Sequence, residues 1–193
     1  MRSAIRILAA ATTALTVIVA SASSATADWL DINLNDNSLF LDYSYMPMEH
    51  SNLHTNFSYL YHSDDDEDDV HMGVLGLFVA ERFSEHTSAA LGGRLYGFDA
   101  AGEKAMVIAI GGTVRQNFPF APLLGVEASG HIAPKVTSFG KAERFFEGGI
   151  RIFYEVLVNA DVYLGYRNVQ VKHENASSET VEDGVHFGLR MRF

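Results

Sequence analysis

Apolar and polar residues alternate at every second position in several short segments of this chain. Between Leu53 and Tyr61, the odd positions carry mostly apolar or aromatic side chains, whereas the even positions are mostly polar. Similar alternation recurs within 122–134 and 144–156. A period of two residues indicates a β-strand whose two faces meet different surroundings. Segments of roughly 9–11 residues or somewhat more also suit tilted strands that cross a membrane.

The alternation predicts ten strands separated by turn-like or charged runs. They are expected at 29–35, 38–46, 52–62, 70–83, 87–98, 105–116, 122–134, 144–156, 160–173 and 184–193. All four prolines fall at breaks or strand ends, where a residue without a backbone donor is tolerated. We therefore expect an all-β fold, a small up-and-down antiparallel transmembrane β-barrel. Ten strands are preferred, and eight strands, reached by two mergers, are the alternative because single-chain bacterial barrels avoid odd numbers.

The N-terminus has the features of a secretory signal peptide. Arg2 and Arg6 precede an apolar stretch, and Ala25-Thr26-Ala27 matches an A-x-A cleavage site. The apolar stretch is too short to span a bilayer comfortably. We predict a cleaved signal peptide over residues 1–27, followed by one β-barrel domain over residues 28–193.

Composition and charge narrow the class of protein. The 24 acidic residues against 14 basic ones give a net charge of −10, which disfavours binding to nucleic-acid phosphates. The chain has no cysteine, so we expect neither a lipoprotein anchor nor disulfides. Its 48% hydrophobic residues are compatible with a barrel that satisfies its own backbone in lipid. The predicted location is the outer membrane of a Gram-negative bacterium.

The C-terminal segment is the sharpest local indication of such a barrel. From Val185 to Phe193, apolar residues alternate with polar or small ones, and the last residue is aromatic. This ending resembles the tail by which the barrel-insertion machinery recognises outer-membrane proteins. We therefore interpret Phe193 as an insertion signal and expect that machinery and outer-membrane lipid as partners.

The same alternation directs many ionisable side chains into the barrel lumen. They are Arg94, Arg115, Glu127, His131, Glu147, Arg151, Glu155, Arg167, His186, Arg190 and Arg192. The central charge cluster of this set comprises Arg94, Glu127, His131, Arg151 and Arg167. Charges inside a tight interior must pair, because unpaired burial is costly.

This charged lumen is compatible with two alternative functions. The first is a structural or interaction role, with the lumen largely filled by paired side chains. The second is a narrow channel for ions or small solutes, although ten strands leave limited room. The excess of Arg over Glu fits either pairing with inward Asp and Asn of the first strands or weak anion selectivity.

An acidic run follows the third predicted strand. It consists of Asp64, Asp65, Asp66, Glu67, Asp68 and Asp69. The run contains no glycine, so it lacks the EF-hand pattern. Two interpretations stay open, a solvated loop and a loose site for Ca²⁺ or Mg²⁺ that bridges to lipopolysaccharide phosphates. No metal ligand set and no cofactor is assigned.

Polar residues near the predicted outer rim give a distant third alternative, an outer-membrane hydrolase. These rim residues are His62, Ser63, Asp64, His131, Ser138, His173 and Ser177. They include no nucleophile motif such as G-x-S-x-G, so we expect that the protein is not an enzyme. Outward aromatic residues near strand ends, Trp29 among them, are expected to form interfacial girdles. Glycine pairs such as Gly92-Gly93 and Gly111-Gly112 are expected to serve curvature or close packing of the wall.

The order of several short motifs resembles the YfaZ family of outer-membrane proteins. The motifs are Asp31-Ile32 with Asn33 to Asp36, Tyr59 to Asp66, Leu91-Gly92-Gly93-Arg94-Leu95-Tyr96, Ala109-Ile110-Gly111-Gly112, Ala133-Pro134, Val162-Tyr163-Leu164-Gly165-Tyr166-Arg167 and Gly188-Leu189-Arg190. They cover nearly all of the chain after the signal peptide. The resemblance implies a small outer-membrane barrel and implies no catalytic set or ligand.

Overall fold

The computed structural model describes residues 27–46, 52–63, 69–100, 103–140, 142–173 and 178–193. The strands are β1 (Ala27–Leu34), β2 (Ser38–Tyr45), β3 (Leu53–His62), β4 (Val70–Arg82), β5 (Thr87–Ala100), β6 (Glu103–Phe118), β7 (Ala121–Ala133), β8 (Ser138–Gly140), β9 (Ala142–Leu157), β10 (Ala160–His173) and β11 (Ser178–Arg192). One turn of 3-10 helix spans Lys135–Thr137. No helix within these residues is long and apolar enough to cross a membrane. The predicted signal peptide lies, apart from Ala27, outside the described residues.

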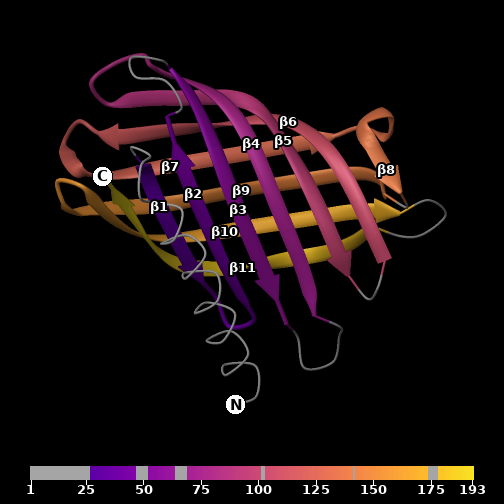
Figure 1. The fold of residues 1–193 in the computed structure, drawn as a ribbon. Coiled ribbons are helices and arrows are strands. Elements are labelled where there is room, and N and C mark those ends of the chain that lie inside the picture. Colours follow the sequence, from indigo (N-terminus) through magenta and orange to yellow (C-terminus); the bar gives the residue numbers. More distant parts are fainter. Residues whose placement is uncertain (1–26, 47–51, 64–68, 101–102, 141, 174–177) are drawn as a thin grey trace.

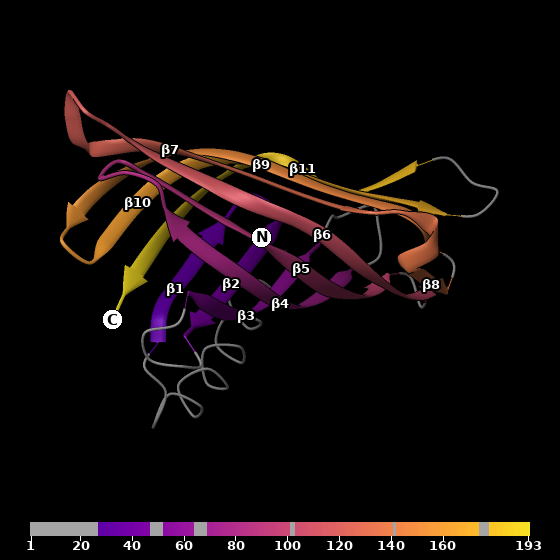
Figure 2. The same ribbon diagram turned by 90° about the horizontal axis from the view of Figure 1, so that it is seen from above.

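Ten long strands close into an up-and-down antiparallel barrel, as the alternation predicts. Each long strand pairs with its neighbours in sequence, and β1 pairs with β11 to complete the ring. The short β8 pairs with residues 105–107 of β6, beyond the part of β6 that pairs with β7. In Figures 1 and 2, β2–β4 form one side of the barrel and β7, β9 and β10 form the facing side.

Chain connections alternate between the two ends of this barrel. We call the end where β1 begins and β11 finishes the terminal end, and the opposite end, which carries β8, the far end (Figure 1). The last strand is longer than predicted, because β11 starts at Ser178 rather than at 184. A register shift opposite Val169 and Gln170 interrupts its pairing with β10. The bulge breaks the alternation that sequence analysis relies on, which explains why this half of β11 is missed.

The outer surface of the wall is apolar over a broad band. Leu91, Ile110, Ile150 and Leu164 each expose more than half of their surface. On β9 the outward apolar positions run from Phe146 to Val156. Ten residues span roughly 33 Å along a strand, and a tilt of about 40° reduces this to a height of ~25 Å. That height matches the lipid-facing band of a membrane barrel.

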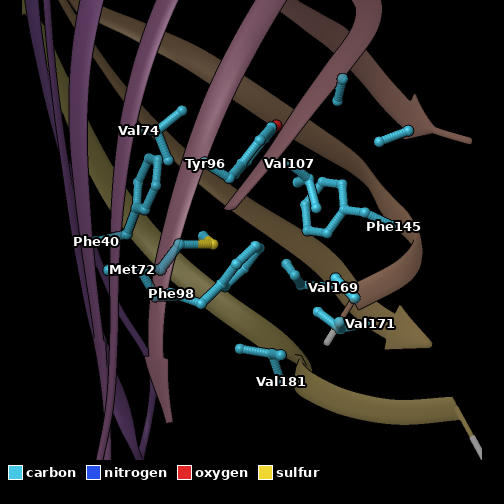
Figure 3. Close-up of a cluster of buried hydrophobic side chains, with 14 residues drawn as sticks. Phe40, Met72, Val74, Tyr96, Phe98, Val107, Phe145, Val169, Val171 and Val181 are labelled. Atoms are coloured by element: carbon cyan, nitrogen blue, oxygen red, sulfur yellow. The ribbon is translucent and has the colours of Figure 1, made fainter. Parts of the chain in front are cut away.

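The interior differs between the two ends of the barrel. Apolar side chains fill the far end, and Figure 3 shows them projecting inward from opposite sides of the wall. This apolar plug consists of Phe40, Leu60, Met72, Val74, Tyr96, Phe98, Val107, Ala109, Ala133, Ala142, Phe145, Val169, Val171 and Val181. At its centre, the ring of Phe145 lies 4.3 Å from that of Tyr96 and 5.4 Å from that of Phe98, measured between centroids. The terminal half of the interior is instead polar and charged.

Two glycines on the inner face of the wall leave room for two large side chains to contact each other inside the barrel. Gly92 and Gly111 are cross-strand partners on β5 and β6, and they lie between Phe78 of β4 and His131 of β7. The Phe78 and His131 rings contact each other edge to face, with centroids 5.8 Å apart. A Cβ at Gly111 would lie 2.0 Å from the Gly130 carbonyl oxygen. Glycine is therefore needed for close packing here, as predicted, because neighbouring backbone and rings occupy the space that a larger side chain would fill.

We expect Gly111→Ala and Gly92→Ala each to destabilise the barrel by about 1–3 kcal/mol, because each Cβ meets backbone that cannot move away. Gly97→Ala is the matched control, since a Cβ there has nothing within 4 Å, and it should change stability by less than about 0.5 kcal/mol. Urea unfolding of the protein in lipid vesicles measures these differences. Equal stability of all three variants would contradict the packing argument.

Candidate functional site

A network of charges crosses the terminal half of the lumen. Arg151 donates to Asp31 Oδ2 at 2.8 Å and also bonds to Glu127. Arg190 reaches the same two carboxylates, at 3.0 Å from Asp31 and 2.9 Å from Glu127. These four side chains come from β1, β7, β9 and β11. Two guanidinium groups and two carboxylates thus join the neighbouring strands β1 and β11 to the neighbouring strands β7 and β9.

A second group of charges lies nearer the terminal end. Arg115 lies 2.9 Å from Asp161 and 3.3 Å from Glu155. Arg192 also pairs with Asp161. Asn117 donates to Glu155 at 3.1 Å. Arg115 further contacts Glu127 at 3.4 Å, so this group is continuous with the first network.

Two further ion pairs border the apolar plug. Arg167 forms a bidentate pair with Glu182, with donor–acceptor distances of 2.7 and 2.9 Å. Arg94 lies 3.1 Å from Glu147, which also accepts a hydrogen bond from Tyr96. Bidentate pairing adds geometric specificity to the charge interaction. Glu147 and Glu182 are the cross-strand partners of Val169, so these pairs place neutralised charge against the apolar plug itself.

Most of these guanidinium groups also stack on an aromatic ring. The guanidinium carbon of Arg115 lies 3.4 Å from the Phe153 ring centroid. The corresponding distances are 4.4 Å for Arg151 over Tyr163 and 4.2 Å for Arg167 over Phe40. Arg94 and Arg190 lie over Phe78 and Trp29. Stacking offers a favourable contact to the guanidinium face while its edge binds carboxylates.

A cavity of about 720 Å³ occupies the polar half of the barrel. Its lining includes Asp31, Arg94 and Arg151, together with exposed residues 84–85 of the β4–β5 turn at the terminal end. The cavity therefore faces outward at that end, and the apolar plug lies at the other. Its size is within the range of pockets that hold small molecules, roughly 300–1,000 Å³.

The structure brings the five residues of the predicted central cluster into this charged interior. Arg94, Glu127, Arg151 and Arg167 each take part in the ion pairs above. His131 is buried beside Glu147, at 3.7 Å between Nδ1 and Oε2. Arg151 and Arg190 pair with Asp31 of the first strand, which agrees with the predicted alternative of pairing with inward Asp of the first strands. Sequence reasoning missed Asp161, Glu182 and the stacking rings. It also predicted that Trp29 faces outward, which is wrong, because its ring lines the cavity beneath Arg190.

The other predicted site residues lie outside this network. Asp64 to Asp68 of the acidic run are outside the described residues, whereas Asp69 accepts a hydrogen bond from Tyr61 at 3.1 Å. Among the rim residues, Ser138 donates to the Pro134 carbonyl, and His131 lies inside the barrel rather than at its rim. Ser177 and the side chain of His173 are not described. Phe193 is 75% exposed next to the last strand, and its role as an insertion signal stays a prediction.

No metal site is evident in the part of the chain that the structure describes, where no group of three or more His, Cys, Asp or Glu residues is arranged to hold an ion. The chemistry that the arrangement offers is instead charge pairing and hydrogen bonding around a one-ended cavity.

Comparison with known proteins assigns the chain to a family. The family model described as YfaZ precursor matches residues 5–193, nearly the whole chain. The chain belongs to the YfaZ precursor family. Together with the closed wall and its apolar exterior, this membership supports an outer-membrane β-barrel protein. A search of curated proteins found no match.

Solved structures similar to this YfaZ-family chain share only a general likeness. The outer membrane channel DcaP of Acinetobacter baumannii matches with 13% identity and a TM-score of 0.42, over 84% of this chain and 54% of the channel. This chain thus spans about half the length of that channel. A structure from work on the in-meso crystallization of membrane proteins matches with 10% identity and a TM-score of 0.39, over 86% of this chain and 83% of the other.

We expect Glu182→Gln and Arg167→Met each to destabilise the barrel by about 3–5 kcal/mol, because each leaves a buried charge without its partner. The double variant should lose much less than the sum of the two single losses. A double-mutant cycle by urea unfolding in lipid vesicles measures this coupling. Glu143→Gln is the control, since Glu143 pairs with the exposed Lys135 at 3.5 Å, and such surface pairs contribute about 0–1 kcal/mol. Strictly additive losses would contradict the inferred pairing.

Proposed function

We propose that this YfaZ-family chain is an integral outer-membrane protein of a Gram-negative bacterium with a structural or interaction role, whose lumen does not conduct. It acts through its wall and loops rather than through transport or catalysis. Its partners are outer-membrane lipid, including lipopolysaccharide, and the barrel-insertion machinery during biogenesis, for which Phe193 is the recognition residue.

Insertion into a membrane is supported by the outward face. An apolar band of ~25 Å would be costly to expose to water and fits the hydrocarbon region of a bilayer. The terminal end is assigned to the periplasm, because short turns are typical of the periplasmic side of bacterial barrels. Residues 119–120 and 158–159 form such turns there.

The observation that carries a non-conducting lumen is the apolar plug at the far end. Hydrated ions that entered the cavity from the terminal end would meet Tyr96, Phe98 and Phe145 next. Stripping water from an ion to pass such side chains costs far more free energy than the contacts return. The charges below the plug offer little compensation, since their arginines already bind carboxylates.

A narrow channel is the second candidate, and the cavity is the observation that favours it. A volume of about 720 Å³ gives small solutes access to half of the barrel. Conduction through the remaining half would need the plug to move aside. The two candidates therefore differ in one measurable property, the permeability of the plug.

We expect the refolded barrel to stay electrically silent in a planar lipid bilayer. Removing two rings from the plug, with Phe98→Ala and Phe145→Ala together, should produce discrete current steps, because it opens the apolar region to water. Phe146→Ala is the matched control, because Phe146 is the next residue on the same strand and faces outward, with 43% of its surface exposed. It should leave the barrel silent.

A heat-modifiable band on SDS gels verifies that each variant is folded before recording. Stable currents through the unmodified barrel would overturn the proposal in favour of a channel. A folded double variant that is as silent as the unmodified protein would show that the plug is not the barrier.

A further inference from the structure

Two basic side chains lie side by side on the outer face of the wall, near the far end. Arg144 of β9 and Lys172 of β10 are direct cross-strand partners. Both are exposed. Side chains directly opposite each other on one face of a sheet have Cβ atoms about 4.5–5.5 Å apart. Two positive charges therefore face the same small area of surface.

These two basic residues differ from the charged residues in the lumen, which form ion pairs. Within the described part of the chain, neither Arg144 nor Lys172 forms an ion pair. The nearby Glu143 is engaged by Lys135, at 3.5 Å. Like charges directly opposite each other destabilise a sheet unless a counter-charge lies between them. The position thus suits an anion that carries more than one charge or more than one oxygen.

The height of the two residues on the wall identifies the kind of anion. Arg144 is the next outward residue beyond Phe146, where the apolar band of β9 ends. Below Lys172, the outward positions of β10 are the polar Gln170 and Asn168, and the exposed apolar side chains begin with Tyr166 and Leu164. A lipid whose acyl chains lie against this band would bring its headgroup to the level of the two cations. Long basic side chains favour that interfacial level.

We propose that Arg144 and Lys172 form a binding site for the phosphate groups of lipopolysaccharide in the outer leaflet. The inference rests on the proposed outer-membrane location, with the far end outside. Lipopolysaccharide combines acyl chains with phosphate groups directly above them, so one molecule contacts both the band and the basic pair. Arg binds phosphate oxygens in a planar, bidentate manner, and Lys adds a point charge.

Thermal unfolding of the folded barrel in detergent, with chelator present, tests this site by titration with purified lipid A. Arg144→Gln with Lys172→Gln should weaken lipid A binding about 30-fold, because each cation near an anionic lipid surface contributes about fivefold in affinity. Arg82→Gln is the control for the loss of an exposed cation elsewhere, because Arg82 lines the mouth of the cavity at the terminal end of β4 and not the outer face near the far end. It should bind lipid A like the unmodified protein.

Removing phosphate from the ligand should reproduce the effect of removing the cations. Monophosphorylated lipid A should bind the unmodified barrel more weakly and discriminate less between it and the double variant. Equal lipid A binding by the double variant and the control would overturn the site. Competition by millimolar inorganic phosphate at equal strength would also overturn it, because the site would then be a phosphate site without lipid specificity. Failure of the unmodified barrel to insert into lipid vesicles would instead reject the outer-membrane location itself.

Discussion

Every charge that points into this barrel has to find its partner inside the barrel. Ten strands enclose a narrow interior, and a guanidinium or carboxylate left there without a partner would lose most of its hydration. The lumen meets this constraint by sharing carboxylates: Asp31 and Glu127 each bind both Arg151 and Arg190. Because the paired groups come from strands far apart in sequence, the same contacts that neutralise charge also fix the closure of the wall.

The position of the charge network divides the interior into two parts. Toward the terminal end, the network borders a cavity of about 720 Å³. Toward the far end, Arg94 and Arg167 stand beneath the apolar plug, each over the ring of a phenylalanine. Between the two parts, the rings of Phe78 and His131 contact each other over Gly92 and Gly111, which have no side chains to block them. The interior is therefore polar toward the terminal end and apolar toward the far end.

Much of the architecture could be predicted from the sequence, because alternation with a period of two determines which side chains face inward. That is why the ten strands and the inward position of Arg94, Glu127, Arg151 and Arg167 are recovered. Inward Asp of the first strands was one predicted kind of partner, but the individual pairs could not be predicted, since Asp31 and Arg151 are 120 residues apart and meet only through the register of the closed sheet. Glu182 was missed for a different reason. A bulge interrupts the alternation in β11, so the strand was predicted to begin only after this residue. Trp29 was misplaced because an aromatic residue near a strand end suits both a membrane interface and stacking on Arg190.

The central claim, an interior that is accessible from the terminal end and closed at the far end, is tested most directly by cysteine labelling. The chain has no cysteine of its own, so Ala90→Cys places a single thiol in the lining of the cavity and Ala109→Cys places one in the plug. A small, membrane-impermeant thiol reagent is added to either side of vesicles that hold the barrel in one orientation. The account predicts that the thiol at position 90 reacts only from the terminal side and that the thiol at position 109 reacts from neither. Reaction at position 90 from both sides, or rapid reaction at position 109, would contradict it.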